Sequence, residues 1–148
     1  MGGHIYFYYV PYESDVNKAL QSLRKREFEA GRYNPVVPFL EFAPDAPLTT
    51  SPGKQHASIE EALEASDADG TRSILDIERI AERPDFGVAV RLPSNRLIEL
   101  YNTDQPARQM VNENMDFFEG IERGQAIYFV LFQDGKLSEL FFAGMSYD

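Results

Sequence analysis

The sequence predicts a single α+β domain, residues 1–148, with an antiparallel or mixed sheet of about four strands and helices packed on one side. Three observations predict this class. Segments 4–10 and 85–92 have the composition or the alternation of strands, capped helical patterns occur along the chain, and the last segment has the signature of a β-hairpin. The chain contains no internal repeat and no boundary that would divide it in two.

The first two elements are a strand and a helix. Residues 4–10, His-Ile-Tyr-Phe-Tyr-Tyr-Val, are apolar or aromatic on both faces, which places this strand inside the sheet, and Pro11 stops it. Ser14 or Asp15 caps a helix that runs to about residue 30, where Gly31 ends it.

Residues 34–57 form a long proline-rich loop. Prolines remove backbone donors and interrupt regular structure, and loops of this length are commonly lids, binding segments or connections. The apolar first half is expected to pack on the body of the domain, through Val36, Val37, Phe39, Leu40 and Phe42. The second half, residues 45–55, is expected to be mobile.

A short helix follows this loop. Ser58 and Glu61 have the spacing of a capping box, in which each side chain satisfies the backbone donor of the other residue. Residues 67–70, Asp-Ala-Asp-Gly, predict a turn; a calcium loop would require an acid at position 65 and Glu at position 76, which are Ala65 and Asp76. Residues 73–81 fit either a helix or a short strand followed by a helix.

The strand at 85–92 alternates apolar and polar side chains, which predicts one solvent-exposed face. A brief helix from Pro93 to Tyr101 follows. Thr103 or Asp104 caps the next helix. Its apolar side consists of Met110, Val111, Met115, Phe118 and Ile121.

Residues 125–132 and 137–143 flank Asp134-Gly135, a dipeptide that favours the type I′ turn of a two-residue hairpin. A regular hairpin about this turn pairs Phe132 with Leu137 and Val130 with Glu139. Glu139 is therefore expected on the less buried face of the hairpin or, if buried, paired with an arginine.

Composition excludes several kinds of chemistry. The chain has no cysteine, which removes disulfides, thiolate metal sites and cysteine nucleophiles. With two histidines, no glycine-rich phosphate loop and no Gly-x-Ser-x-Gly motif, the sequence gives no catalytic residue, metal site or cofactor. Whether the protein is an enzyme stays open, and the lack of a motif favours a non-catalytic role.

The formal net charge is −10. Nucleic-acid binding requires a cationic face, so no nucleic-acid partner is expected, whereas a basic protein is a suitable partner. No apolar stretch is long enough for a membrane span, and the amino-terminal residues do not resemble a signal peptide, so a cytoplasmic location is expected.

The candidate ligand-binding residues lie around the end of the first helix. Arg24, Glu27, Arg32 and Tyr33 combine guanidinium groups with a carboxylate and a phenol, and arginine forks suit phosphate or carboxylate ligands. His56 is the best proton-transfer candidate because its ordinary pKa is near neutral. Cations near a helix C-terminus also complement the helix dipole, so these residues equally fit a purely structural role.

Two hypotheses of function follow. The first is a small acidic protein-binding module, of the inhibitor or immunity type, that neutralises a basic partner. The second is a small enzyme or anionic-ligand-binding protein with a pocket between the end of the first helix and the proline-rich loop. A flat acidic or aromatic surface favours the first, and a deep pocket with convergent polar groups favours the second.

Overall fold

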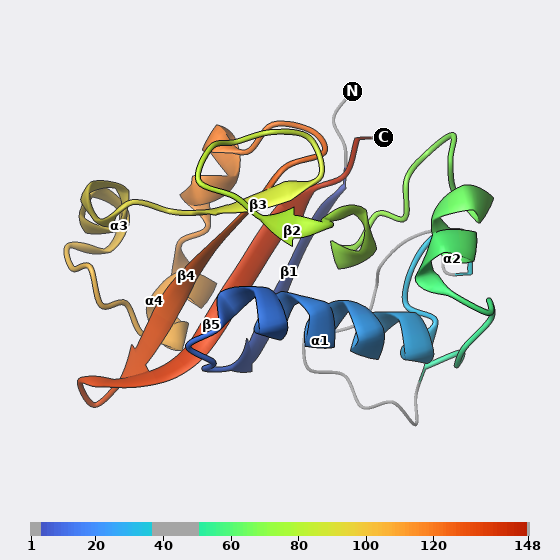
Figure 1. Cartoon of the computed structure of the whole chain (residues 1–148). Helices are drawn as coiled ribbons and strands as arrows, with labels where there is room; N and C mark the ends of the chain where they lie inside the picture. The colour runs from blue at the N-terminus through green and yellow to red at the C-terminus, as the bar shows by residue number, and fades with distance from the viewer. Residues whose placement is uncertain (1–3, 37–50, 148) are drawn as a thin grey trace.

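The computed structural model describes residues 4–36 and 51–147 and contains one five-stranded mixed sheet (Figure 1). The strands are β1 (Ile5–Pro11), β2 (Arg79–Ile80), β3 (Val88–Arg91), β4 (Ala126–Gln133) and β5 (Lys136–Met145). They lie in the order β1-β5-β4-β3-β2, with β2, β3 and β4 parallel and β5 antiparallel to both β4 and β1. The α+β class and the C-terminal hairpin are confirmed, and the sheet has one strand more than expected.

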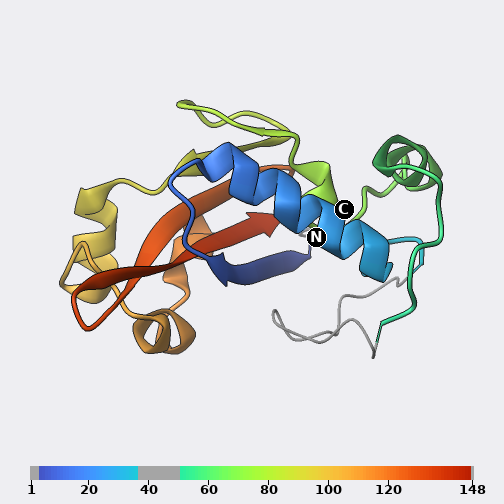
Figure 2. The same cartoon turned by 60° about the horizontal axis from the view of Figure 1, so that its bottom comes forward.

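Helices cover both faces of the sheet instead of one (Figure 2). Helix α1 (Val16–Ala30) packs on one face. Helices α3 (Ser94–Tyr101) and α4 (Arg108–Glu113) and the 3₁₀ helix η3 (Asp116–Gly120) lie on the other. The physical reason is that the central strands are apolar on both sides, so each face needs a cover.

A third, smaller cluster lies beyond the C-terminal end of α1, where α2 (Ile59–Ala65) and the 3₁₀ helix η2 (Ile74–Asp76) pack (Figure 1). Its buried members are Phe28, Tyr33, Ala62 and Leu75. This cluster anchors the segment that follows the proline-rich loop, and it contains one of the candidate residues, Tyr33.

Strand β1 lies at the edge of the sheet, so the prediction that it is inside the sheet is wrong. Its side chains are nevertheless covered on both faces: Tyr6 and Tyr8 belong to the core under α1, and Tyr9 belongs to the core under α3 and α4. A strand's faces and its hydrogen-bonding edges are independent, and only the faces determine the sequence pattern.

Strand β3 also differs from its prediction. Ala89 is fully buried under α1, whereas Val90 and Leu92 contribute to the opposite core. The face predicted to be exposed is therefore covered at Ala89 and exposed at Arg91. Alanine is small enough to pack beneath a helix. The alternation of large apolar residues with Ala89 therefore does not show that Ala89 is exposed.

The predicted helix boundaries are mostly confirmed. Asp15 caps α1, Gly31 ends it in the left-handed conformation, and Ser58 accepts a hydrogen bond from the backbone N–H of Glu61. The helix expected after Thr103 is instead split into α4 and η3, which begin after Ala107 and Met115. Residues 73–81 contain η2 and then β2.

The hairpin has the predicted turn but a different register. Asp134 and Gly135 both have positive φ, as a type I′ turn requires, and Phe132 does pair with Leu137. A β-bulge between Leu131 and Phe132 then shifts β5 by one residue, so that Glu139 pairs with Leu131. The predicted pairing of Val130 with Glu139 is therefore wrong, because turn chemistry fixes only the register next to the turn.

The expectations that the first half of the proline-rich loop packs on the domain and that residues 45–55 are mobile concern mainly residues 37–50, which lie outside the described residues. The described end of this loop, from Ser51 onward, packs against α1 through a hydrogen bond from the Gly53 N–H to the Ala30 carbonyl.

Candidate functional site

The predicted ligand-binding residues separate into three groups in the structure. Glu27 and Arg32 form the first, as a buried ion pair in which each side chain is less than a twentieth exposed. The Arg32 guanidinium donates from Nε to Glu27 Oε1 at 2.9 Å and from a terminal nitrogen to Oε2, which is a bidentate contact. Arg26 also donates to Glu27, over 2.9 Å. The Glu27 carboxylate is therefore already paired with two arginines of the same chain.

Tyr33 and His56 form the second group. The Tyr33 hydroxyl and His56 Nδ1 are 2.6 Å apart, and the Tyr33 ring stacks on Phe28. Burial raises the pKa of the Tyr33 phenol, so at neutral pH this hydroxyl keeps its proton, and the tautomer of the imidazole determines which of the two groups donates. The contact fixes His56 against the end of α1.

Backbone contacts hold these two groups together. Gly31 adopts φ 71°, and a Cβ at this position would lie 2.3 Å from the Gly53 carbonyl oxygen. Only glycine permits this close approach, which brings residues 51–56 across the end of α1. Ser51 Oγ then accepts a hydrogen bond from Arg32 over 3.1 Å.

Arg24 is the third group and lies apart from the others. It is 9 % exposed and donates to Gln21 and to the Leu75 carbonyl, at 3.0 and 3.1 Å. Burial lowers the pKa of its guanidinium, an effect that the charges of Glu78 and Asp76 oppose. The structure therefore brings Glu27, Arg32, Tyr33 and His56 together and leaves Arg24 outside.

Arg24 lines a cavity of about 390 Å³, which we call the α2 pocket. Its apolar walls come from α2, η2 and the loop before β3, and its lining carries three carboxylates and one guanidinium. The residues are Arg24, Ile59, Glu60, Leu63, Leu75, Asp76, Glu78, Phe86 and Gly87. Such a mixture of acidic and apolar groups suits a cation with an apolar stem.

Asp76 is the least expected group in this pocket. Its Oδ1 accepts hydrogen bonds from the Thr71 N–H and hydroxyl, at 2.8 and 2.7 Å. Burial raises the pKa of this carboxyl, although the hydrogen bonds from Thr71 act in the opposite direction. The surroundings of Asp76 therefore disfavour the ionised form of its carboxyl group.

An acidic surface adjoins the α2 pocket. Five carboxylates occur between residues 60 and 69, and no Lys or Arg occurs between Lys54 and Arg72. All five side chains are exposed, and we call them the acidic face: Glu60, Glu61, Glu64, Asp67 and Asp69. Phe86, on the rim of the pocket, is 60 % exposed.

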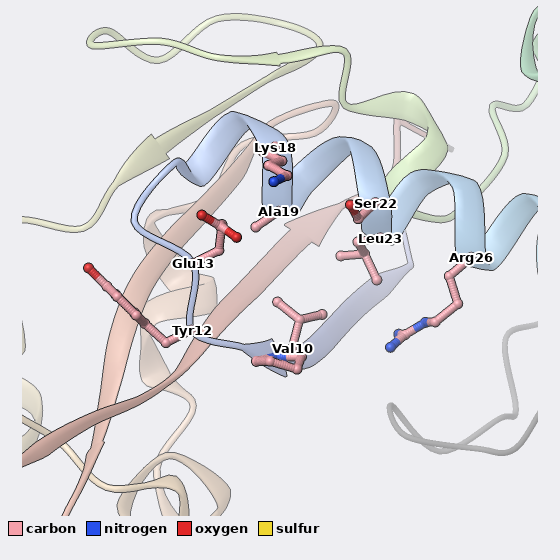
Figure 3. A pocket seen from close by; sticks show the side chains of 9 residues that line it. Val10, Tyr12, Glu13, Lys18, Ala19, Ser22, Leu23 and Arg26 are labelled. Carbon is pink, nitrogen blue, oxygen red and sulfur yellow. The ribbon is translucent and has the colours of Figure 1, made fainter.

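Two of the remaining cavities have both acidic and basic side chains in their lining. One, of about 710 Å³, is beside the bulge of the hairpin, where Arg108 stacks on the Tyr9 ring at 3.9 Å and approaches Glu139 within 3.7 Å. The expected arginine partner of Glu139 is therefore Arg108. The other, of about 290 Å³, lies between α1 and the end of β1 (Figure 3).

Comparison of the chain with protein-family models, with curated proteins and with solved structures finds no match. Within residues 4–36 and 51–147, no group of three His, Asp or Glu side chains is placed to hold a metal ion. No described helix is both long enough and apolar enough to cross a membrane.

Sequence reasoning missed Asp76, Phe86 and Arg108 as parts of cavities. Asp76 was considered only as a failed calcium ligand, and Phe86 only as a strand residue. Arg108 gave no signal, because its neighbours Tyr9 and Glu139 are distant in sequence. The run of acids at 60–69 without a basic residue was the one available signal for the acidic face.

Proposed function

We propose that the protein is an acidic binding module that docks onto a basic protein through the acidic face and the adjoining α2 pocket. The observation that carries the proposal is that Glu60, one of five exposed carboxylates between residues 60 and 69, also lines an apolar cavity whose rim holds the exposed ring of Phe86. Interfaces typically combine an apolar anchor with a polar rim, and this part of the molecule offers both.

Charge supports a basic partner over other classes. The net charge of −10 repels nucleic acid, and complementary charge accelerates association with a cationic protein. The proposed module works in the cytoplasm and catalyses no reaction. Its finer role, by analogy of size and charge, is that of an inhibitor or immunity protein that neutralises its partner.

The alternative function, binding of an anionic ligand near the end of α1, has less geometric support. Glu27 already takes the Arg32 fork, and Arg24 lies on another side of the helix end. An anion there would have to compete with a buried carboxylate of the same chain.

The proposal is tested with a pair of double variants that change net charge equally. Glu60→Lys/Glu64→Lys reverses two charges of the acidic face, and Glu119→Lys/Glu122→Lys reverses two exposed charges before β4. Each immobilised variant and the wild type are exposed to lysate of the source cell at low and at moderate salt, and retained proteins are identified by mass spectrometry.

We expect a stoichiometric basic protein on the wild type and on the Glu119/Glu122 variant, lost from the Glu60/Glu64 variant and weakened by salt. Equal loss from both variants would mean that total charge, not the acidic face, governs binding. A partner retained by all three proteins, or no partner at all, would also contradict the proposal.

A further inference from the structure

The cavity between α1 and β1, which we call the β1 groove, is a second candidate binding site and differs in charge from the acidic face. Its floor consists of Val10, Ala19 and Leu23, each less than a tenth exposed. Figure 3 shows Val10 rising from the strand toward Ala19 and Leu23 of the helix. The floor is thus apolar and comes from two elements that the core holds rigidly.

The rim of the groove is more basic than acidic. Lys18 and Arg26 are its cations and Glu13 is its one carboxylate, so the lining carries a net charge of +1 in a chain of net charge −10. Arg26 also pairs with Glu27, which lies outside the lining, so Lys18 is the main cation of the rim. Lys18 is exposed and forms no ion pair with any described residue. Charge complementarity here favours an acidic occupant, in contrast to the acidic face.

The strand beside the groove can accept another strand. In the described part of the chain β1 has a single neighbour, β5. The hydrogen bonds from Ser146 to His4 and from Tyr12 to Ser138 show that the even-numbered residues of β1 bond to β5. Antiparallel pairing then directs the backbone groups of odd-numbered residues to the outer edge. Beside the groove these residues are Tyr9, with an N–H and a carbonyl, and Pro11, which offers a carbonyl alone.

We propose that an extended acidic peptide of another protein adds to the edge of β1 and inserts one aliphatic side chain into the β1 groove. Strand addition of this kind obtains affinity from main-chain hydrogen bonds and specificity from a pocket for alternate side chains. A volume of about 290 Å³ accommodates one side chain of leucine size. The site uses other residues than the acidic face and does not depend on the proposed function.

The spacing of the rim defines the sequence of the peptide. Lys18, Ser22 and Arg26 are four residues apart on one face of α1, so the two cations are about 12 Å apart along the axis. Side chains two residues apart in a strand point the same way and are about 6.6 Å apart. The span from −2 to +2 of a strand is thus similar to the separation of the two cations, and the peptide used as a probe therefore has the motif acid–x–aliphatic–x–acid.

The test uses a labelled serine–glycine peptide with the core Glu-Ser-Leu-Ser-Glu, blocked at both ends. Its binding to the wild-type chain is measured by fluorescence polarisation, and the affected residues are mapped by chemical-shift changes. Three control peptides replace both Glu by Lys, replace Leu by Ser, or carry N-methyl groups on alternate backbone nitrogens.

Lys18→Glu and Lys25→Glu form a matched pair of variants. Both residues are exposed on α1, but Lys25 lies outside the groove and pairs with Glu29. We expect the dissociation constant to rise about tenfold for Lys18→Glu and less than twofold for Lys25→Glu. The control peptides should bind at least about tenfold more weakly than the parent peptide.

Several results would overturn the proposal. One is no binding of the parent peptide at about 1 mM, the weak limit of specific recognition. Others are equal effects of the two lysine variants, or shift changes that avoid β1 and α1. Concentration-dependent shift changes at Val10 and Leu23 without peptide would assign the groove to a second copy of the chain. These results do not bear on the acidic face, whose test uses different residues.

Discussion

Two arginine–glutamate pairs lie at different places in the fold and differ in burial. Glu27 and Arg32, at the end of α1, have side chains about 4 % and 3 % exposed and meet in a bidentate contact. Arg108 and Glu139, beside the hairpin bulge, are 41 % and 25 % exposed and approach within 3.7 Å through one nitrogen. The same two residue types thus form one buried structural pair and one half-exposed pair at a cavity.

This difference shows why residue type alone does not mark a binding site. Removing one member of a buried pair leaves an uncompensated charge in the interior, so such a pair is committed to the fold. A half-exposed pair contributes little to stability, because water already solvates both groups, and it can rearrange around a ligand.

The largest expected effect is that of Arg32→Met. It leaves Glu27 buried with the partly exposed Arg26 as its cation and should lower the free energy of unfolding by about 3 kcal/mol, measured by urea denaturation. Arg26→Met is the control, because Arg26 is one-third exposed and Glu27 keeps its fork with Arg32; its loss should be about 1 kcal/mol. Equal losses would show that Arg32 has no special role.

Glu27 and Arg32 are close in sequence, whereas Arg108 and Glu139 are distant. The sequence predicts features of the first kind and not of the second. Helix α1, its cap at Asp15 and its end at Gly31 follow from residues near one another, and so does the cluster of Glu27, Arg32 and Tyr33. The hairpin turn follows from Asp134-Gly135 for the same reason. Local spacing determines these features, and no distant contact is needed to specify them.

Distant contacts account for the features that the sequence did not predict. The edge position of β1 and the bulge that carries Glu139 depend on which strands pair and how they twist. The two-sided cover of the sheet depends on helices contributed from both ends of the chain. Arg24 separated from Arg32 because η2, some fifty residues later, supplies the carbonyl of Leu75 to its guanidinium.

Gly31→Ala tests the backbone that supports the buried pair. The new methyl group would stand in the left-handed region and 2.3 Å from the Gly53 carbonyl oxygen, so we expect a loss of about 2 kcal/mol in thermal or urea unfolding. Gly135→Ala is the matched control, since its φ is also positive but no atom lies within 4 Å; it should cost about 1 kcal/mol. The reverse order would rule out the close approach of residues 31 and 53.

Asp76→Asn tests a carboxyl group that, unlike that of Glu27, accepts no bidentate contact from an arginine among the described residues. Because burial raises the pKa of Asp76 in the folded state, its contribution to stability is complete below the pKa of the unfolded chain. That contribution is lost as the pH rises through the raised pKa. The unfolding free energy of wild type minus that of the variant should therefore fall from about pH 4 toward neutrality.

Asparagine keeps an acceptor for the Thr71 hydrogen bonds, so the comparison isolates the titration. Urea denaturation at several pH values measures the difference. A difference that stays constant with pH would mean that Asp76 titrates alike in the folded and unfolded chains.

The smallest expected effect is that of Arg108→Ala, at about 0.5 to 1 kcal/mol, since its ion pair with Glu139 is screened by water and the rest comes from its stacking on Tyr9. A double-mutant cycle with Glu139→Ala should give a coupling below about 0.5 kcal/mol that salt reduces further. A coupling of several kcal/mol would place this pair in the same class as Glu27–Arg32, and burial would then no longer distinguish the two regions. A small coupling instead leaves Arg108 and Glu139 able to exchange partners at the mouth of their cavity with little cost to the fold.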